Sequence, residues 1–167
     1  KDKVFRLVYI NFGTPELEKM TNYYHEIMGY SIEKREENQI NYLSNGFDHH
    51  NIILTHSNKS EVINYGYQLT DKYSLEEYSD YLSQKGFSNE IKNNIVAGVS
   101  ELIEVKDPSG NVLHLFQSID MAKSNYSNKG IAPFKLGHVA FYSNVIKETI
   151  NFYQEILDFY CTDTIAD

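Results

Sequence analysis

The sequence has 167 residues, and 15 Lys and Arg against 23 Asp and Glu leave a formal net charge of −8. An acidic surface repels phosphate backbones, which argues against nucleic acid as a partner. The hydrophobic fraction of 41% supports a folded core, yet no apolar run could span a bilayer and the first residues lack the apolar stretch of a secretory signal. The single cysteine, Cys161, cannot form an internal disulfide. These features predict a cytoplasmic globular protein that binds no membrane.

The first predicted unit covers residues 4–56. Side chains that alternate in polarity from Leu7 to Phe12 indicate an opening strand. A helix is expected over residues 15–28, because apolar side chains recur there at helical spacing and Gly29 can end the helix in the left-handed region. Strands that complete the sheet of this unit are expected before residue 56.

The second predicted unit has the same shape and covers residues 62–118. A strand over 65–69 precedes a helix over 74–85, which begins at a capping box formed by Ser74 and Glu77. Strands follow around 95–99 and 101–106. The turn Asp107–Gly110, with its proline and glycine, then leads into a last strand over 111–117.

A third unit repeats the beginning of the first. Residues 136–159 align with residues 7–30 without a gap, and six positions are identical: Leu7 and Leu136, Phe12 and Phe141, Asn22 and Asn151, Tyr24 and Tyr153, Glu26 and Glu155, Ile27 and Ile156. This repeat predicts a strand over 136–141 and a helix over 145–157. The helix would have no sheet of its own to cover, so we expect the chain to be the leading part of a longer protein.

The predicted organisation follows from these three units. Residues 1–120 form a two-module domain, the polar stretch 121–132 is a linker, and residues 133–167 begin a second, incomplete domain.

Paired βαβββ modules with a DPSGN turn before the last strand resemble the vicinal oxygen chelate superfamily, which includes glyoxalase I, bleomycin-resistance proteins and type I extradiol dioxygenases. The resemblance covers the chain from about residue 4 to residue 159. It implies an α+β fold in which the paired modules form one curved mixed sheet, the glyoxalase/bleomycin resistance/dihydroxybiphenyl dioxygenase fold. A third unit that opens with Gly137-His138-Val139-Ala140-Phe141 resembles the four-module, ring-cleaving dioxygenases of the catechol 2,3-dioxygenase type.

In that group the second half carries the metal, and the resemblance implies that His138 is one of its ligands. Two imidazoles and a carboxylate on one face of Fe(II), or of Mn(II), leave positions open for substrate and oxygen. The two remaining ligands and the catalytic base would then lie beyond Asp167. A His inside a strand can also be an ordinary core residue.

The first half departs from the ligand pattern of the family. Tyr9 occupies the place of His138, and Gly66 or Tyr67 falls where the second module would supply a ligand. His114 replaces the carboxylate of the family. His50 is expected to share one face of a strand with Ile52, Leu54 and His56, so either His50 and His114 form a vestigial metal pair or the two are hydrogen-bonded remnants of a decayed site.

We therefore predict an extradiol dioxygenase that cleaves a catechol-type aromatic with O2 and a non-haem metal, acting as a homo-oligomer and inactive in this chain alone. Two alternatives stay open. One is a non-enzymatic member that sequesters a small flat ligand in the paired-module cavity, which the aromatic fraction of 14% would suit. The other is a glyoxalase-like lyase or isomerase, which Tyr9 and His114 disfavour.

Overall fold

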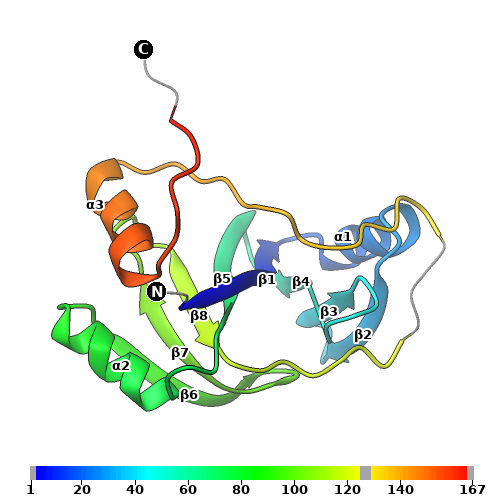
Figure 1. Ribbon diagram of the computed structural model, residues 1–167. Helices are drawn as coiled ribbons and strands as arrows, with labels where there is room; N and C mark the ends of the chain where they lie inside the picture. Colours follow the sequence, from blue (N-terminus) through cyan, green and yellow to red (C-terminus); the bar gives the residue numbers. More distant parts are fainter. Residues whose placement is uncertain (1–2, 125–128, 165–167) are drawn as a thin grey trace.

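The computed structural model describes residues 3–124 and 129–164. Eight strands form one curved mixed sheet in the order β2-β3-β4-β1-β5-β8-β7-β6 (Figure 1). The elements in chain order are β1 (Val4–Thr14), α1 (Leu17–Asn22), the π-helical turn η1 (Tyr23–Ile27), β2 (Ser31–Glu36), β3 (Ile40–Ser44), β4 (Ile52–His56), β5 (Glu61–Leu69), α2 (Leu75–Gln84), β6 (Asn89–Val96), β7 (Val99–Lys106), β8 (Val112–Phe116), α3 (Ile146–Asn151) and the π-helical turn η2 (Phe152–Ile156).

The sheet consists of two modules with the same connectivity. In each module the first strand lies parallel to the fourth, β1 to β4 and β5 to β8. The two first strands, β1 and β5, pair antiparallel and join the modules at the centre of the sheet. This arrangement relates the modules by an approximate two-fold axis and confirms the predicted α+β fold of paired βαβββ modules.

The helices lie on the outer face of the curved sheet, where the apolar stripes predicted from the sequence are buried. Helix α1 covers β3 and β4, and α2 covers β6 and β7. The capping box of α2 is present: Glu77 N donates to Ser74 Oγ at 3.2 Å, and Ser74 N donates to Glu77 Oε2 at 2.8 Å. None of the helices in the described part of the chain has the length and apolar character that a membrane crossing requires.

The internal repeat is confirmed down to the backbone hydrogen bonds. Both copies begin as an α-helix and then widen into a π-helical turn at the equivalent residue. Met28 N donates to Tyr23 O at 3.1 Å, and Leu157 N donates to Phe152 O at 3.3 Å. A gapless alignment of the two segments was therefore sufficient to predict that they share one local conformation.

The third unit differs from the prediction in its strand. Residues 136–141 form no strand, because within the described residues no neighbouring strand pairs with them. The helix that follows has no sheet of its own to cover, and Phe152, Ile156 and Leu157 pack instead into the core formed by α2 and the outer face of β5, β7 and β8. The helix of the third unit thus completes the outer layer of the second module.

One smaller prediction also needs correction. The strand expected around 95–99 is β6, which begins earlier, at Asn89, and ends before the Ala97-Gly98 turn into β7. Of the expected linker, residues 125–128 lie outside the described residues. On either side of them the chain is fastened to the first module: Lys123 N and Ser124 N donate to the Glu33 carboxylate, and Ile131 N donates to Ile27 O.

Candidate functional site

The inner face of the sheet brings together the positions that the sequence singled out in the first half. Tyr9 on β1 pairs with Gly66 on β5, and Gly66 pairs with His114 on β8, so the three residues form a row across the centre of the sheet. A Cβ atom on Gly66 would fall within the Tyr9 ring. Glycine at this position therefore allows the Tyr9 side chain to lie across β5 and reach His114.

A line of hydrogen bonds runs from Tyr9 toward the edge of the sheet. The Tyr9 hydroxyl lies 2.9 Å from His114 Nδ1, and His114 Nε2 lies 3.2 Å from Glu104 Oε2. The other oxygen of Glu104 accepts from Lys92 Nζ at 2.8 Å. Both ring nitrogens of His114 are therefore occupied, one by a phenol and one by a carboxylate.

The electrostatics of this line favour a neutral His114 and Tyr9. Burial lowers the pKa of His114, although the Glu104 carboxylate acts in the opposite direction. Burial also raises the pKa of Tyr9 well above its usual value. At Glu104, hydrogen bonds from Lys92 and His114 outweigh the effect of partial burial and lower the pKa of the carboxyl. The charged groups of the line thus lie at its solvent end, and the neutral groups lie in the core.

His50 lies beside this line without joining it. Its ring centroid is 4.7 Å from that of Tyr9, and its Nδ1 lies 3.0 Å from Nδ1 of His49. Its Nε2 is buried and has no hydrogen-bond partner. Burial, together with the neighbouring His49, lowers the pKa of His50 to about 3, so this imidazole is neutral at physiological pH.

These residues do not fit a metal ion. Tyr9 lies between His50 and His114, both nitrogens of His114 are engaged, and the Nδ1 of His50 faces His49. No three His, Cys, Asp or Glu side chains in the described ranges 3–124 and 129–164 are grouped so that they could hold a cation. Of the two readings of the first half, the contacts favour hydrogen-bonded remnants over a vestigial pair.

Two register predictions are now resolved. The residue that faces the inner row is Gly66, whereas Tyr67 packs on the outer face. His50 does not share a face with Ile52 and Leu54, because it precedes β4 and turns toward Tyr9 and Tyr42 on the inner side. The prediction was wrong because the alternation of side chains between the two faces was extended past the start of β4 to His50.

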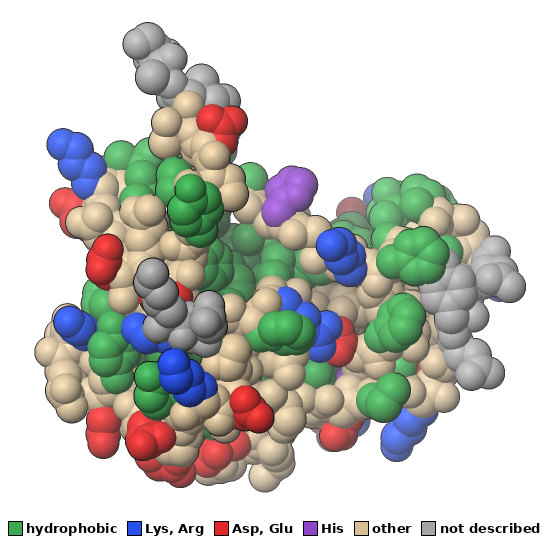
Figure 2. Space-filling model, viewed as in Figure 1, with side chains coloured by type: hydrophobic (Ala, Val, Ile, Leu, Met, Phe, Trp, Pro, Cys, Tyr) green, Lys and Arg blue, Asp and Glu red, His purple; other side chains and the backbone are tan. Residues whose placement is uncertain are grey.

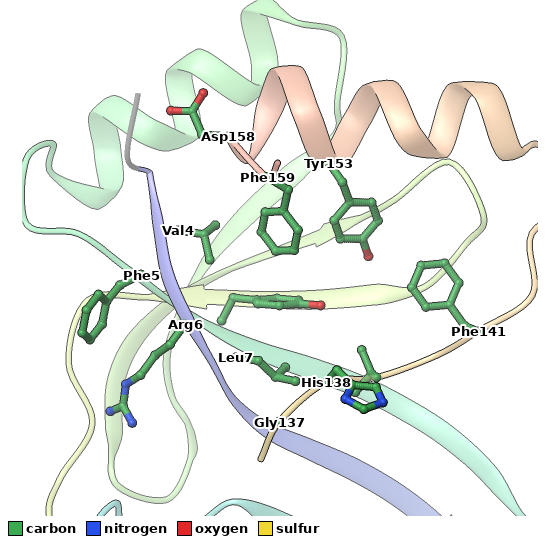
Figure 3. A pocket seen from close by; sticks show the side chains of 12 residues that line it. Val4, Phe5, Arg6, Leu7, Gly137, His138, Phe141, Tyr153, Asp158 and Phe159 are labelled. Carbon is green, nitrogen blue, oxygen red and sulfur yellow. The ribbon is translucent and has the colours of Figure 1, made fainter. Parts of the chain in front are cut away.

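The segment that carries His138 crosses the outer face of the sheet and roofs a cavity of about 510 Å³ (Figures 2 and 3). His138 itself is exposed at its rim. Aromatic rings gather on one wall, where Tyr153 lies 5.9 Å from Phe141 and 5.2 Å from Phe159 between ring centroids. The floor is the first part of β1.

Some residues of the inner face carried no signal in the sequence. Glu104 and Lys92 lie on neighbouring strands of the second module. The contacts of Glu104 with His114 and with Lys92 depend on the β6-β7-β8 register. His49 is next to His50 in sequence, but only the loop conformation turns the two rings together. The alternating polarity of β7 could have indicated that Glu104 faces the same side as other inner residues.

A family model described as "Glyoxalase/Bleomycin resistance protein/Dioxygenase superfamily" matches residues 6–115. Among curated proteins, none matches the sequence. The fold is similar to that of the 2,3-dioxygenase LapB from Pseudomonas sp. KL28, with a TM-score of 0.86 and 22% identity over 95% of this chain and 60% of that one.

Similar folds also occur in homoprotocatechuate 2,3-dioxygenases. The enzyme from Brevibacterium fuscum, as its E323L mutant, matches with a TM-score of 0.66 and 21% identity over 73% of this chain and 34% of that one. The enzyme from Arthrobacter globiformis matches with a TM-score of 0.66 and 20% identity, over 73% and 38%. The chain therefore spans less than two thirds of the length of each of these structures.

Proposed function

Because the chain belongs to the glyoxalase/bleomycin resistance/dioxygenase superfamily, we propose that it is the leading part of an extradiol dioxygenase that cleaves a catechol-type aromatic. The observation that carries this proposal is the extent of the match to LapB. It covers 95% of the chain, which is more than the two modules alone and includes much of the third unit. A single pair of modules would not account for a third copy of the opening sequence and its helix.

The proposal gives the two parts of the chain different roles. The inner face of the first module pair is filled by its own side chains: Tyr9 and Phe116 are buried and stack with their ring centroids 5.6 Å apart. We assign this half to scaffolding. The third unit would supply His138 to a site completed by residues that follow Asp167, and the ion held there would be Fe(II) or Mn(II), which accept nitrogen and oxygen ligands.

The partners under this proposal are a small aromatic substrate and O2, and the assembly is a homo-oligomer. Residues 3–124 and 129–164 do not form a metal site by themselves. Their contribution is to hold the segment that would carry one ligand.

The test is a spectrophotometric assay of the natural polypeptide that contains residues 1–167, with a panel of catechols, O2 and added Fe(II) or Mn(II). We expect a yellow ring-opened product that forms with equimolar O2 uptake. His138→Ala should abolish it, whereas His56→Ala, which changes an exposed histidine at the end of β4, should leave it unchanged. Full activity of His138→Ala would refute the assignment.

A second candidate function is the binding of a small flat ligand without chemistry. The observation in its favour is the aromatic-walled cavity of about 510 Å³ under the third-unit segment, rather than the inner face of the modules, which is packed. Two results together would favour this candidate over the dioxygenase. The wild-type protein would bind an aromatic probe, with weaker binding in Phe159→Ala, and it would form no ring-opened product with any catechol.

A further inference from the structure

Two turns of the first module pair hold the segment that carries His138. The turn between β3 and β4 and the turn between β7 and β8 are equivalent, because each connects the third and fourth strands of its module. The segment 134–143 runs across the molecule from the first module to α3 (Figure 1). Side chains from the two turns bind its two ends.

At the first end, Asn45 Nδ2 donates to Phe134 O at 2.6 Å. The Asn45 side chain is buried, and its orientation is fixed by the turn, since Asn45 Oδ1 accepts from Phe47 N at 3.3 Å. The backbone N of Asn45 in turn donates to Asn51 Oδ1 at 3.0 Å. Contacts within the turn therefore set the orientation of the Asn45 amide that binds the segment.

At the second end, the hydroxyl of Ser109 lies 2.8 Å from that of Ser143 and 2.7 Å from that of Thr149. Thr149 Oγ1 donates to Val145 O at 2.9 Å, which leaves it free to accept from Ser143, 3.0 Å away. Ser109 can then donate to Ser143. The three hydroxyls form a closed cluster, in which the hydrogen of Ser109 lies within reach of both Ser143 and Thr149.

A second contact of the same turn holds the helix that follows the segment. Asp107 Oδ2 accepts from the Tyr153 hydroxyl at 3.0 Å. The Tyr153 ring lies 5.9 Å from Phe141, and Phe141 lies 6.1 Å from Tyr65 on β5. The Asp107–Gly110 turn thus determines where the helix sits and, through these rings, where the segment meets the sheet.

Between these two ends no described strand pairs with the segment, and His138 lies near its middle. We propose that the two turns position His138, with Asn45 and Ser109 as positioning residues. Asn45 acts through the backbone carbonyl of Phe134, and Ser109 acts through the hydroxyl of Ser143. The consequence for metal binding rests on the proposed function. The positioning itself does not, because it follows from contacts within residues 1–167.

The position of the segment can be measured directly by electron spin resonance. Nitroxide labels at Ala140→Cys and Ser100→Cys, both exposed positions, in a Cys161→Ser background report one distance distribution. We expect Asn45→Asp combined with Ser109→Ala to broaden this distribution at least two-fold. Asn93→Asp combined with Ser60→Ala, which makes the same chemical changes at exposed positions, should not broaden it.

An unchanged distribution in the double variant would overturn the proposal. If Asn45→Asp prevents folding, which a melting curve reveals, Ser109→Ala alone carries the test under the same criterion. In the polypeptide with ring-cleavage activity, the double variant should weaken metal binding about ten-fold. A broadened distribution with unchanged metal affinity would refute the link to His138, whereas a wild type without activity would refute only the proposed function.

Discussion

At the residue scale, one glycine determines how the inner face is filled. Tyr9 crosses β5 at Gly66 and ends at His114, so the space where a Cβ would stand is occupied by the Tyr9 ring. Because Tyr9, His114 and the neighbouring Phe116 are buried, the row acts as part of the core. The sequence identified Tyr9, His50 and His114 as related positions, but their mutual contacts depend on the register of three strands.

Gly66→Ala should destabilise the protein by about 3 kcal/mol, at the upper end of the cost of overpacking, because the obstacle is a buried ring rather than a flexible side chain. In a Tyr9→Leu background the ring is absent, and the same substitution should cost less than about 1 kcal/mol. Urea unfolding of the four proteins of this cycle measures the coupling. Gly137→Ala, at an open position, is the control, and equal costs of Gly66→Ala in both backgrounds would contradict the account.

Protonation of His50 should make the protein less stable in mild acid. Its pKa is about 3 in the folded protein against 6.5 for an unperturbed histidine, so the unfolded chain binds the proton first as the pH falls. The stabilisation is complete above pH 6.5 and is lost progressively between pH 6.5 and about pH 3. Between pH 7.5 and pH 5 this loss amounts to about 2 kcal/mol.

The matched measurement is chemical unfolding of the wild type and of His50→Gln, which stays neutral, at both pH values. The wild type should lose about 2 kcal/mol more than the variant. His114, whose pKa is also lowered by burial, contributes equally to both proteins. The same pH dependence in the two would show that His50 is not held neutral by the fold.

At the scale of elements, the helix of the third unit belongs to the outer layer of the second module. The helix α3–η2 packs on no sheet of its own. Its last carbonyl groups accept hydrogen bonds from α2: Tyr78 Oη donates to Ile156 O at 2.9 Å, and Tyr81 Oη donates to Glu155 O at 3.1 Å. The segment before the helix packs on the same core, since Leu136, Val139 and Phe141 are partly buried against it.

Phe152→Ala should destabilise the whole sheet by about 3–5 kcal/mol, because Phe152 is fully buried with its ring centroid 4.8 Å from that of Phe87. Hydrogen exchange should then accelerate in β5 and β8 as well as in the helix. Ile150→Ala, at a half-exposed position of α3, should leave exchange in these strands unchanged. Faster exchange confined to residues 143–159 in Phe152→Ala would show that the helix is a separate unit.

The elements that could be predicted from sequence are those that local chemistry specifies. The capping box fixed the start of α2 at Ser74, and the gapless repeat predicted a second helix equivalent to the first, although not the π-helical turn that ends each copy. The strand expected over 136–141 was wrong because a strand requires a partner, which local alternation cannot supply. The side of the sheet that His50 faces was wrong for a related reason, since alternation holds only inside a strand.

At the scale of the whole molecule, the chain combines a packed module pair with the exposed His138. Residues 1–167 alone should bind Fe(II) or Mn(II) weakly, because a divalent site needs several convergent donors and His138 is a single one. Isothermal titration should give no stoichiometric site, and His138→Ala should not change the result. A tight site in residues 1–167 would mean that the inner face binds metal after all.

The central claim is that a metal site is completed around His138 in the natural polypeptide that contains this chain. The most direct measurement is the metal content of that polypeptide, purified as the wild type and as His138→Ala. We predict about one Fe or Mn per chain in the wild type and almost none in the variant, with circular dichroism spectra that coincide. Equal metal content in the two proteins, or a wild type that retains no metal after loading, would contradict the claim.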